Sequence, residues 1–584
     1  MPPGRKRKQP SDGEAESALV APAKRQTRYR ESVVSAPPEK RGRKGASVAS
    51  STADSLKDSL ATATESIVTT VTEPDGFPKD DGKLKPVEET ATRSERDHAV
   101  DTQIDETPTA DKDEKETDVV TKQEPVTNGF KEGAKEHPNS VFPPPYKLRK
   151  TTGKTIIPIP ALKTKPLNIY VFGTGSMSEL GLGPDAKNKE VKRPRLNPFL
   201  PIDGISIVDF AVGGAHVLAI DKNGKLLSWG CNDHGALGRN TSGGEEGLLR
   251  DMDADDDDDD GDLNPLESTP AFVENLPDDL VFVQIAASDN LSLALTSEGR
   301  LWTWGTFRCN EGVLGFSDKV EFQVTPVQIP IPYPVGQIVA GKDHVLALTT
   351  NGKVFAWGNG QQFQLGRRVV ERARMQSLHP REFGIKNIKF IGSGEFHAFA
   401  IDTSNRVMAW GLNQYGQCGI PSEGAGEDGA VVTSPTYIDA LKDKDIISIT
   451  GGEHHSIALS STGDIYSFGR LDSCEIGVKK DELPDTIVKD AAGHPRFLPI
   501  PTKIDVEDDT KFKLVTCGSH HSIALAREDG SAWSWGFGET YQVGQGPAAE
   551  DVEIPTKIEN TATRGVNMLL AGAGGQFSVL GGIQ

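Results

Sequence analysis

The chain has 584 residues, with 64 Lys+Arg against 84 Asp+Glu, which gives a formal net charge of −20. It holds no run of 18 apolar residues, and its start, MPPGRKRKQP, has no apolar stretch behind the charges, so the sequence predicts neither a membrane-spanning helix nor a secretory leader. The five cysteines are scattered, which indicates neither a disulfide framework nor a zinc site.

Residues 1–150 are predicted to be a disordered tail, because they hold no Trp or Cys and consist mainly of Pro, Ser, Thr and charged residues. Residues 1–50 carry twelve Lys/Arg against five Asp/Glu, whereas residues 51–140 carry eleven against 22, so a basic half precedes an acidic one. Three basic clusters predict nuclear import and contact with nucleic-acid phosphates, with a merely solvated tail as the alternative. They are Arg5, Lys6, Arg7 and Lys8, then Lys24 and Arg25, then Lys40, Arg41, Arg43 and Lys44.

The rest of the chain is built from one repeat. Residues 210–230 read FAVGGAHVLAIDKNGKLLSWG, and five further segments follow this pattern, the last at residues 515–536. The His position is occupied by His216, Leu291, His344, His397, His455 and His521. An aromatic–Gly pair follows each, with Trp229, Trp304, Trp357, Trp410, Phe468 and Trp535 as the aromatic residue.

A seventh copy is split between the two ends of this region. Residues 574–580 match the front half of the repeat and residues 169–181 match the back half, so the two ends must meet, which predicts a closed ring. Each copy has the signature of a β-hairpin and leaves room for two more strands. The predicted fold class is therefore all-β: a seven-bladed β-propeller over residues 160–584, closed by pairing of its N- and C-terminal strands. Residues 243–264 are an acidic insertion, predicted to be a disordered loop.

Beyond the repeat, several stretches resemble the regulator of chromosome condensation family: SWGCNDHGALGR (228–239), WGTFRCNEGVLGF (304–316) and GGEHHS (451–456). WGLNQYGQCGI (410–420) is similar to its fungal members. The resemblance covers residues 160–584 and implies a guanine-nucleotide exchange factor for the small GTPase Ran. It further implies a nuclear protein that is imported by a receptor, binds chromatin through histones and DNA, and generates Ran-GTP for nucleocytoplasmic transport and for spindle and cell-cycle functions.

Each copy turns into its first hairpin strand at a Gly-x-x-His motif (GxxH), which is GGAH at residues 213–216 in the first copy. Antiparallel pairing is expected to bring these turns and the aromatic–Gly ends to one face of the disc, here called the GxxH face. By position, the resemblance implies that Asp289, Asp343 and His454 contact the GTPase; the alternative is that they are ordinary exposed polar residues. The second copy carries two extra residues after Gly305. In the family this loop is a β-wedge against the nucleotide site, which implies that role for Arg308, Asn310, Glu311 and Gly312; a longer loop without function is the alternative. Ser176 stands where the family has Asp.

The repeated histidines and tryptophans are predicted to be structural, each His bonding a neighbouring backbone group. One His per blade cannot converge on a metal ion. The sequence holds no phosphate-binding loop, nucleophile elbow or metal-ligand cluster, so we expect exchange without covalent chemistry and without a cofactor. For the basic stretch at residues 367–381, the family implies contact with the nucleosome, without a single assigned residue.

Two other functions remain open from the sequence. One is a chromatin-bound propeller scaffold without exchange activity. The other is a propeller enzyme, which predicts titratable groups with perturbed pKa values at the axis. The small, apolar inward strands disfavour the enzyme.

Overall fold

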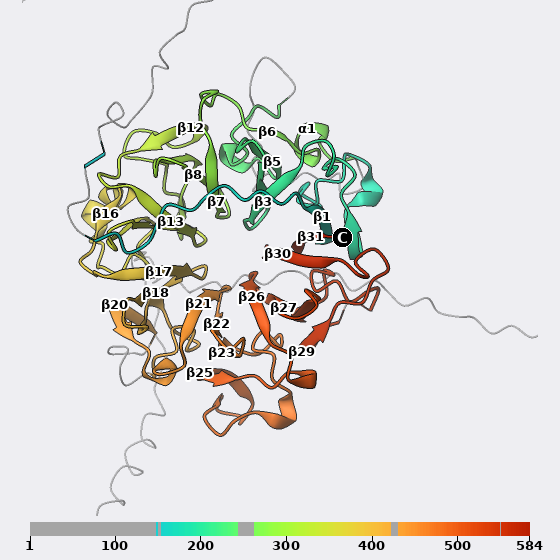
Figure 1. Cartoon of the computed structure of the whole chain (residues 1–584). Coiled ribbons are helices and arrows are strands. Elements are labelled where there is room, and N and C mark those ends of the chain that lie inside the picture. The colour runs from blue at the N-terminus through green and yellow to red at the C-terminus, as the bar shows by residue number, and fades with distance from the viewer. Residues whose placement is uncertain (1–147, 150–153, 243–261, 422–429, 549) are drawn as a thin grey trace, which may run out of the picture. The chain divides into compact units, whose positions relative to one another are not determined.

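The computed structural model describes residues 148–149, 154–242, 262–421, 430–548 and 550–584. All of them lie in the second of the two units into which the chain divides, residues 127–584. Seven antiparallel sheets of four or five strands are arranged as blades around a central axis (Figure 1), with one further two-stranded sheet, which confirms the predicted seven-bladed propeller. The α-helix of this part of the chain is α1 (Pro265–Ser268); its 3₁₀ segments are η1 (Ala186–Asn188), η2 (Asp233–Gly235), η3 (Glu371–Leu378), η5 (Asp439–Leu441), η6 (Lys480–Glu482) and η7 (Glu507–Asp509). None of the helices described is long and apolar enough to cross a membrane.

The first three blades each correspond to one copy of the repeat. Blade one consists of β3 (Ile207–Val212), β4 (His216–Asp221), β5 (Leu226–Gly230) and β6 (Ala271–Phe272). Blade two consists of β7 (Phe282–Ala287), β8 (Leu291–Thr296), β9 (Leu301–Gly305) and β12 (Gln323–Ile329). Between its last two strands, β10 (Arg308–Cys309) and β11 (Gly312–Val313) pair with each other. Blade three consists of β13 (Val335–Ala340), β14 (His344–Thr349), β15 (Val354–Gly358) and β16 (Arg381–Glu382).

The next three blades follow the same order. Blade four consists of β17 (Ile388–Ser393), β18 (His397–Asp402), β19 (Val407–Leu412) and β20 (Val431–Tyr437). Blade five has an additional strand and consists of β21 (Ile446–Gly451), β22 (His455–Ser460), β23 (Ile465–Arg470), β25 (Pro495–Lys503) and β24 (Val488–Lys489). Blade six consists of β26 (Phe512–Cys517), β27 (His521–Ala526), β28 (Ala532–Gly536) and β29 (Val552–Lys557).

Blade seven closes the ring with strands from both ends of the region. Its order is β2-β1-β31-β30, formed by β2 (Glu190–Leu196), β1 (Asn168–Thr174), β31 (Phe577–Ile583) and β30 (Asn567–Ala573). Strands β1 and β31 are antiparallel, with Asn168 opposite Gly582 and Gly173 opposite Phe577. The split seventh repeat is therefore one sheet. This pairing leaves neither terminal strand with an open edge inside the ring.

Packing between neighbouring blades explains the repeated aromatic and glycine positions. The side chains of Trp229, Trp304, Trp357, Trp410 and Trp535 are among the largest that are fully buried. The Trp304 indole N–H of blade two donates to the Ala236 carbonyl of blade one at 2.8 Å. Gly238 lies directly against this ring, because a Cβ there would lie 2.7 Å from the Trp304 nitrogen. A side chain at Gly238 would therefore separate the two blades.

Residues 154–167, here called the strap, cross the face opposite the GxxH face before the chain enters β1 (Figure 1). The Ile156 N–H donates to the Thr350 carbonyl at 2.8 Å, at the turn between β14 and β15. Further along, the Lys163 ammonium lies 2.7 Å from Asp209 in β3. The strap thus joins blade three to blade one, and residues 154–159, which precede the predicted start at 160, also pack on the propeller.

Parts of the sequence-based predictions fall outside the described residues, namely the tail up to residue 147 and residues 243–261 of the acidic insertion. The end of that insertion is described and packs on the fold. Leu263 is buried, and the Asn264 side chain accepts a hydrogen bond from Leu266 N–H at the start of α1. The predicted disordered loop is therefore wrong for residues 262–264, because an apolar anchor and a helix cap stand there.

Candidate functional site

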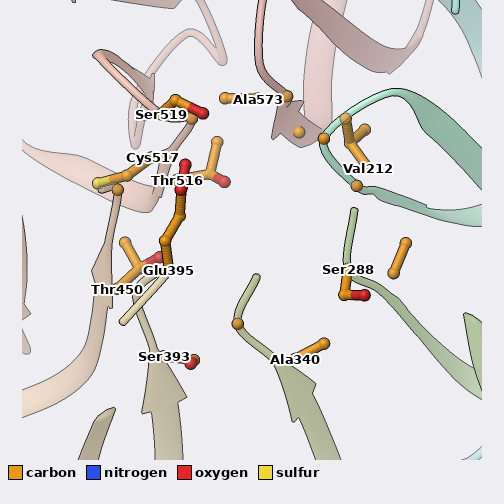
Figure 2. A pocket seen from close by; sticks show the side chains of 18 of the residues that line it. Val212, Ser288, Ala340, Ser393, Glu395, Thr450, Thr516, Cys517, Ser519 and Ala573 are labelled. Atoms are coloured by element: carbon orange, nitrogen blue, oxygen red, sulfur yellow. The ribbon is translucent and has the colours of Figure 1, made fainter. Parts of the chain in front are cut away.

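The GxxH loops of the blades are bonded to one another around the axis. The Lys342 N–H donates to the Glu395 carbonyl at 3.0 Å, and the Glu453 N–H donates to the Ser519 carbonyl at 3.0 Å. These loops surround the mouth of a cavity of about 250 Å³ on the axis. Figure 2 shows Glu395 reaching into it between small side chains of the inner strands, including Ser288, Ala340, Ser393, Thr450, Thr516 and Ala573. The bonded loops form a stiff rim on which side chains are held in place.

Four charged residues stand two positions before the His position in successive blades: Asp289, Lys342, Glu395 and Glu453. The Lys342 Nζ lies 3.5 Å from Asp289 Oδ2 and 3.5 Å from Glu395 Oε2. Burial raises the pKa of Asp289 to about 6, and Lys342 opposes this shift while Glu395 adds to it. Glu395 and Asp289 together raise the pKa of Lys342. The sequence analysis identified Asp289 and missed the other three, although all four stand at the same position of the repeat and could have been found by that position.

Asp343 points inward rather than outward. Its side chain is buried, and its Oδ1 accepts a 2.7 Å hydrogen bond from the Arg308 backbone N–H at the base of β10. Its own carbonyl accepts from the Asn359 N–H at 2.7 Å. Burial raises the pKa of Asp343 to about 7, and the nearby Asp289 carboxylate adds to this. The expectation that the GxxH face displays this side chain is wrong, because the loop turns it toward the hairpin that follows β9.

His454 is also largely enclosed, with 9% of its surface exposed. Its Nε2 lies 3.2 Å from Gln414 Nε2, its Nδ1 lies 3.6 Å from Glu453 Oε2, and the Tyr415 ring stands edge-on at 4.8 Å between centroids. Glu453 also pairs with His520 across 3.0 Å. Burial alone would lower the pKa of His520, but the hydrogen bond with Glu453 raises it. Glu453 therefore joins the imidazoles of blades five and six.

The predicted wedge loop is a short hairpin. Arg308 pairs with Val313 and Cys309 with Gly312, so Asn310 and Glu311 form its turn. Gly312 has φ +116°, and an added Cβ would meet no described atom within 4 Å, so this end of the hairpin is open. The Arg308 guanidinium lies 3.8 Å from Asp233 of blade one. The structure thus brings the hairpin together with Asp343, and places His454 two blades further around the same face.

Two further predicted features take definite places. Ser176 is exposed in the loop that follows Phe172-Gly173, on the GxxH face. In the basic stretch, the Arg367 side chain donates to the Ala356 carbonyl at 3.3 Å, and burial lowers its pKa to about 10. Arg381 pairs with Ala356 as part of β16. The Arg367 side chain is therefore engaged with blade three, whereas Arg381 belongs to the outer strand of that blade with its side chain exposed.

The repeated histidines bond serine side chains of the neighbouring blade. His216 Nε2 lies 2.8 Å from Ser292 Oγ, and Ser292 in turn donates to the Ala236 carbonyl at 2.7 Å. The other pairs are His344–Ser393, His397–Ser456, His455–Ser522 and His521–Ser578, at 2.7 to 3.1 Å. The sequence analysis predicted a backbone partner and missed these serines. For His216 and His344 the backbone does contribute, because hydrogen bonds with the backbone of Asp289 and of Glu395 oppose the effect of burial on their pKa values. Burial lowers the pKa of His216 to about 4 and those of His344, His455 and His521 to about 3.

In the described part of the chain, no group of three or more His, Cys, Asp or Glu residues could hold a metal ion. The three basic clusters of the tail, from Arg5 to Lys44, lie outside the described residues. The site is therefore built from the rim charges, the enclosed Asp343 and His454, and the hairpin.

Known proteins match this chain over the propeller. A family profile described as RCC1-like domain matches residues 168–580. Guanine nucleotide exchange factor SRM1 of Saccharomyces cerevisiae is 55% identical over 434 residues, which cover 72% of this chain and 89% of the relative. Protein pim1 of Schizosaccharomyces pombe is 45% identical over 458 residues, which cover 78% of this chain and 82% of the relative.

Solved structures agree with these matches. The crystal structure of Prp20p from Saccharomyces cerevisiae, described with its binding properties to Gsp1p and histones, has a TM-score of 0.66 at 52% identity and covers 73% of this chain and 93% of that one. The structure of Kap60 bound to yeast RCC1 (Prp20) has a TM-score of 0.68 at 51% identity and covers 76% of this chain and 96% of that one. The chain therefore belongs to the RCC1-like family of seven-bladed propellers, the regulator of chromosome condensation family.

Proposed function

We propose that this protein is a guanine-nucleotide exchange factor for Ran that acts from chromatin in the nucleus. The observation that carries the proposal is the hairpin β10–β11, which stands on the GxxH face beside Asp343 and the charged rim. A relative at 55% identity carries the name of a guanine nucleotide exchange factor, and its match spans 89% of that protein. The Prp20p structure, at 52% identity, is described with binding to Gsp1p and histones.

Exchange requires binding energy rather than bond making. A factor that binds the nucleotide-free GTPase better than the loaded one weakens nucleotide binding by the same ratio, because the two equilibria are linked. On this proposal the hairpin presses on the nucleotide site of the GTPase. Asp289 and the other charged residues of the rim contact the GTPase surface around that site. No covalent intermediate is formed, and the direction of exchange follows the concentrations of GDP and GTP.

Chromatin binding, import and nuclear location belong to the same proposal. The basic clusters within residues 5–44 offer the charge that nuclear import and nucleic-acid phosphates require. The solved complex of Kap60 with yeast RCC1 supports recognition by an import receptor.

One observation favours the propeller enzyme: Asp289, Lys342 and Asp343 are titratable groups with shifted pKa values near the axis. We favour exchange nonetheless, because Lys342 lies between two carboxylates and Asp343 is bonded to backbone, so both are engaged within the protein. The scaffold hypothesis differs from exchange in predicting that the hairpin and Asp343, and with them Asp289, are dispensable.

The test is release of a fluorescent GDP analogue from Ran by the full chain, with Asp289→Ala as the site variant. Glu298→Ala is the matched control, because Glu298 lies in the same blade at the opposite face, where it pairs with Arg300. Fast release that is slowed by Asp289→Ala and unaffected by Glu298→Ala supports the proposal. Release at the spontaneous rate by a folded protein contradicts it, and nucleosome pull-downs would then test the scaffold.

A further inference from the structure

The hairpin β10–β11 is too short to hold its own orientation. It contains two residue pairs, Arg308 with Val313 and Cys309 with Gly312. An isolated hairpin is marginal in water even when it is longer, so contacts outside β10–β11 must set the angle of this one. Its base is fixed by the buried Phe307, whose carbonyl accepts from the Leu314 N–H at 2.8 Å, and by Asp343, which accepts from the Arg308 N–H. The turn, which would meet a partner first, needs a second support.

That support comes from Gln361 in the loop after β15. The Gln361 Oε1 accepts from the Asn310 backbone N–H at 3.1 Å. The Gln361 Nε2 donates to both carboxylate oxygens of Glu311, at 3.0 and 2.9 Å. One side-chain amide thus holds two consecutive turn residues. The backbone N–H of Gln361 donates to Asn359 Oδ1 at 2.9 Å, which fixes the residue itself. Arg374 of η3 adds a weaker contact, 3.5 Å from Glu311.

Empty space lies beside these contacts. A cavity of about 390 Å³ separates the hairpin from the loop and η3, and Cys309, Leu314, Gln361, Phe363 and Arg374 are among the residues that line it. A hairpin with open space beside it can tilt when its side-chain supports are removed. Gln361 therefore bridges a gap that packing leaves unfilled.

We propose that Gln361 is a positioning residue of the exchange reaction: by holding Asn310 and Glu311 it keeps the hairpin at one angle to the GxxH face before the GTPase arrives. The inference rests on the proposed function, since it assigns the hairpin a partner. Preorganisation of this kind raises the rate of the step that the group performs, because ordering costs are met before the encounter. Loss of Gln361 should therefore lower kcat and leave KM nearly unchanged.

The experiment compares full-length variants in release of the fluorescent GDP analogue from Ran. Gln361→Ala is expected to lower kcat about tenfold, as a displaced reacting group does. Glu311→Gln combined with Gln361→Glu interchanges amide and carboxylate, so the pair reforms and Asn310 keeps its acceptor. The kcat of this double variant should match that of Glu311→Gln alone, which is the reference because Glu311 belongs to the hairpin turn. Gln361→Glu alone puts two carboxylates together and should stay slow. Gln362→Ala is the matched control, because Gln362 joins the same loop through its backbone N–H.

Hydrogen exchange in the free chain supplies a readout without the GTPase. The Asn310 amide hydrogen should exchange faster in Gln361→Ala than in the wild type. It should regain protection in the double variant Glu311→Gln, Gln361→Glu. Unchanged kcat and unchanged protection in Gln361→Ala would overturn the inference. A raised KM that the double variant does not correct would also overturn it and would indicate direct contact with the GTPase. If the wild type does not accelerate release of the GDP analogue from Ran, the proposed function fails. The hydrogen-exchange data then show separately whether Gln361 holds the hairpin.

Discussion

His216 of blade one lies 2.8 Å from Ser292 of blade two, and both side chains are fully buried. At two other interfaces the residues at the positions of His216 and Ser292 are both apolar. Leu291 of blade two shares a core cluster with Val345 of blade three, and the Phe577 position shares one with Val217. Each interface therefore carries either a bonded polar pair or an apolar pair, because a lone buried polar group would lack a partner. At the interface of blades three and four the serine stands elsewhere: Ala398 occupies the position of Ser292, and His344 bonds Ser393 of β17 instead.

This relationship predicts the effect of substitutions at one interface. Ser292→Ala should lower the free energy of unfolding by about 1–3 kcal/mol, since it leaves the buried His216 nitrogen without its partner. His216→Leu combined with Ser292→Val copies the Leu291–Val345 pair and should recover most of that loss. Urea unfolding of the two variants and the wild type measures both. A double variant no more stable than Ser292→Ala would contradict the pairing rule.

The pKa shifts of the histidines predict a dependence of stability on pH. The pKa of His216 falls from 6.5 to about 4 on folding, so between these values the unfolded chain binds a proton that the folded chain does not. The free energy of unfolding should therefore decrease as the pH falls from 6.5 toward 4. The raised pKa values of Asp289 and Asp343 act in the opposite direction over part of this range.

A comparison between variants isolates the histidine contribution. The combined His216→Leu and Ser292→Val protein lacks this titrating group, so its thermal midpoint should fall less steeply than that of the wild type between pH 6.5 and pH 4.5. Equal slopes would show that His216 does not titrate in this window.

The contact between Asp343 and Arg308 predicts different effects for two substitutions. Asp343→Asn keeps an oxygen that can accept from the Arg308 N–H, whereas Asp343→Ala removes it. We expect Asp343→Asn to keep kcat for nucleotide release within about threefold and Asp343→Ala to lower it about tenfold or more, since one of the contacts that orient the base of the hairpin is then lost. An equal loss in both would indicate that the charge itself acts on the GTPase.

The strap predicts a stability effect far from the GxxH face. Ile157 is half-buried and packs against blade three, where Gly336 approaches it closely. Ile157→Ala should lower the free energy of unfolding by about 1–2 kcal/mol through lost apolar burial. The neighbouring Pro158 is exposed, so Pro158→Ala serves as the control. Thermal unfolding of both variants makes the comparison, and equal midpoints would mean that the strap does not stabilise the ring.

The sequence alone determined the ring. A repeat with strand-length apolar segments dictates a blade, its number of copies dictates seven blades, and a repeat split between the ends requires closure. The face that carries Asp289 and the hairpin also followed, since antiparallel pairing leaves one arrangement for each hairpin. These features depend on local periodicity, which is written in the order of the residues.

The tertiary structure alone decided which side chains meet. Asp343 bonds the backbone of Arg308, His216 bonds Ser292, and Gln361 supports Glu311, each across a boundary between separate strands or blades. Periodicity does not specify these contacts, because a loop can turn its side chain outward or inward without any change in the strands that flank it. The direction was set by which polar groups of the adjacent blade needed partners once the ring had closed.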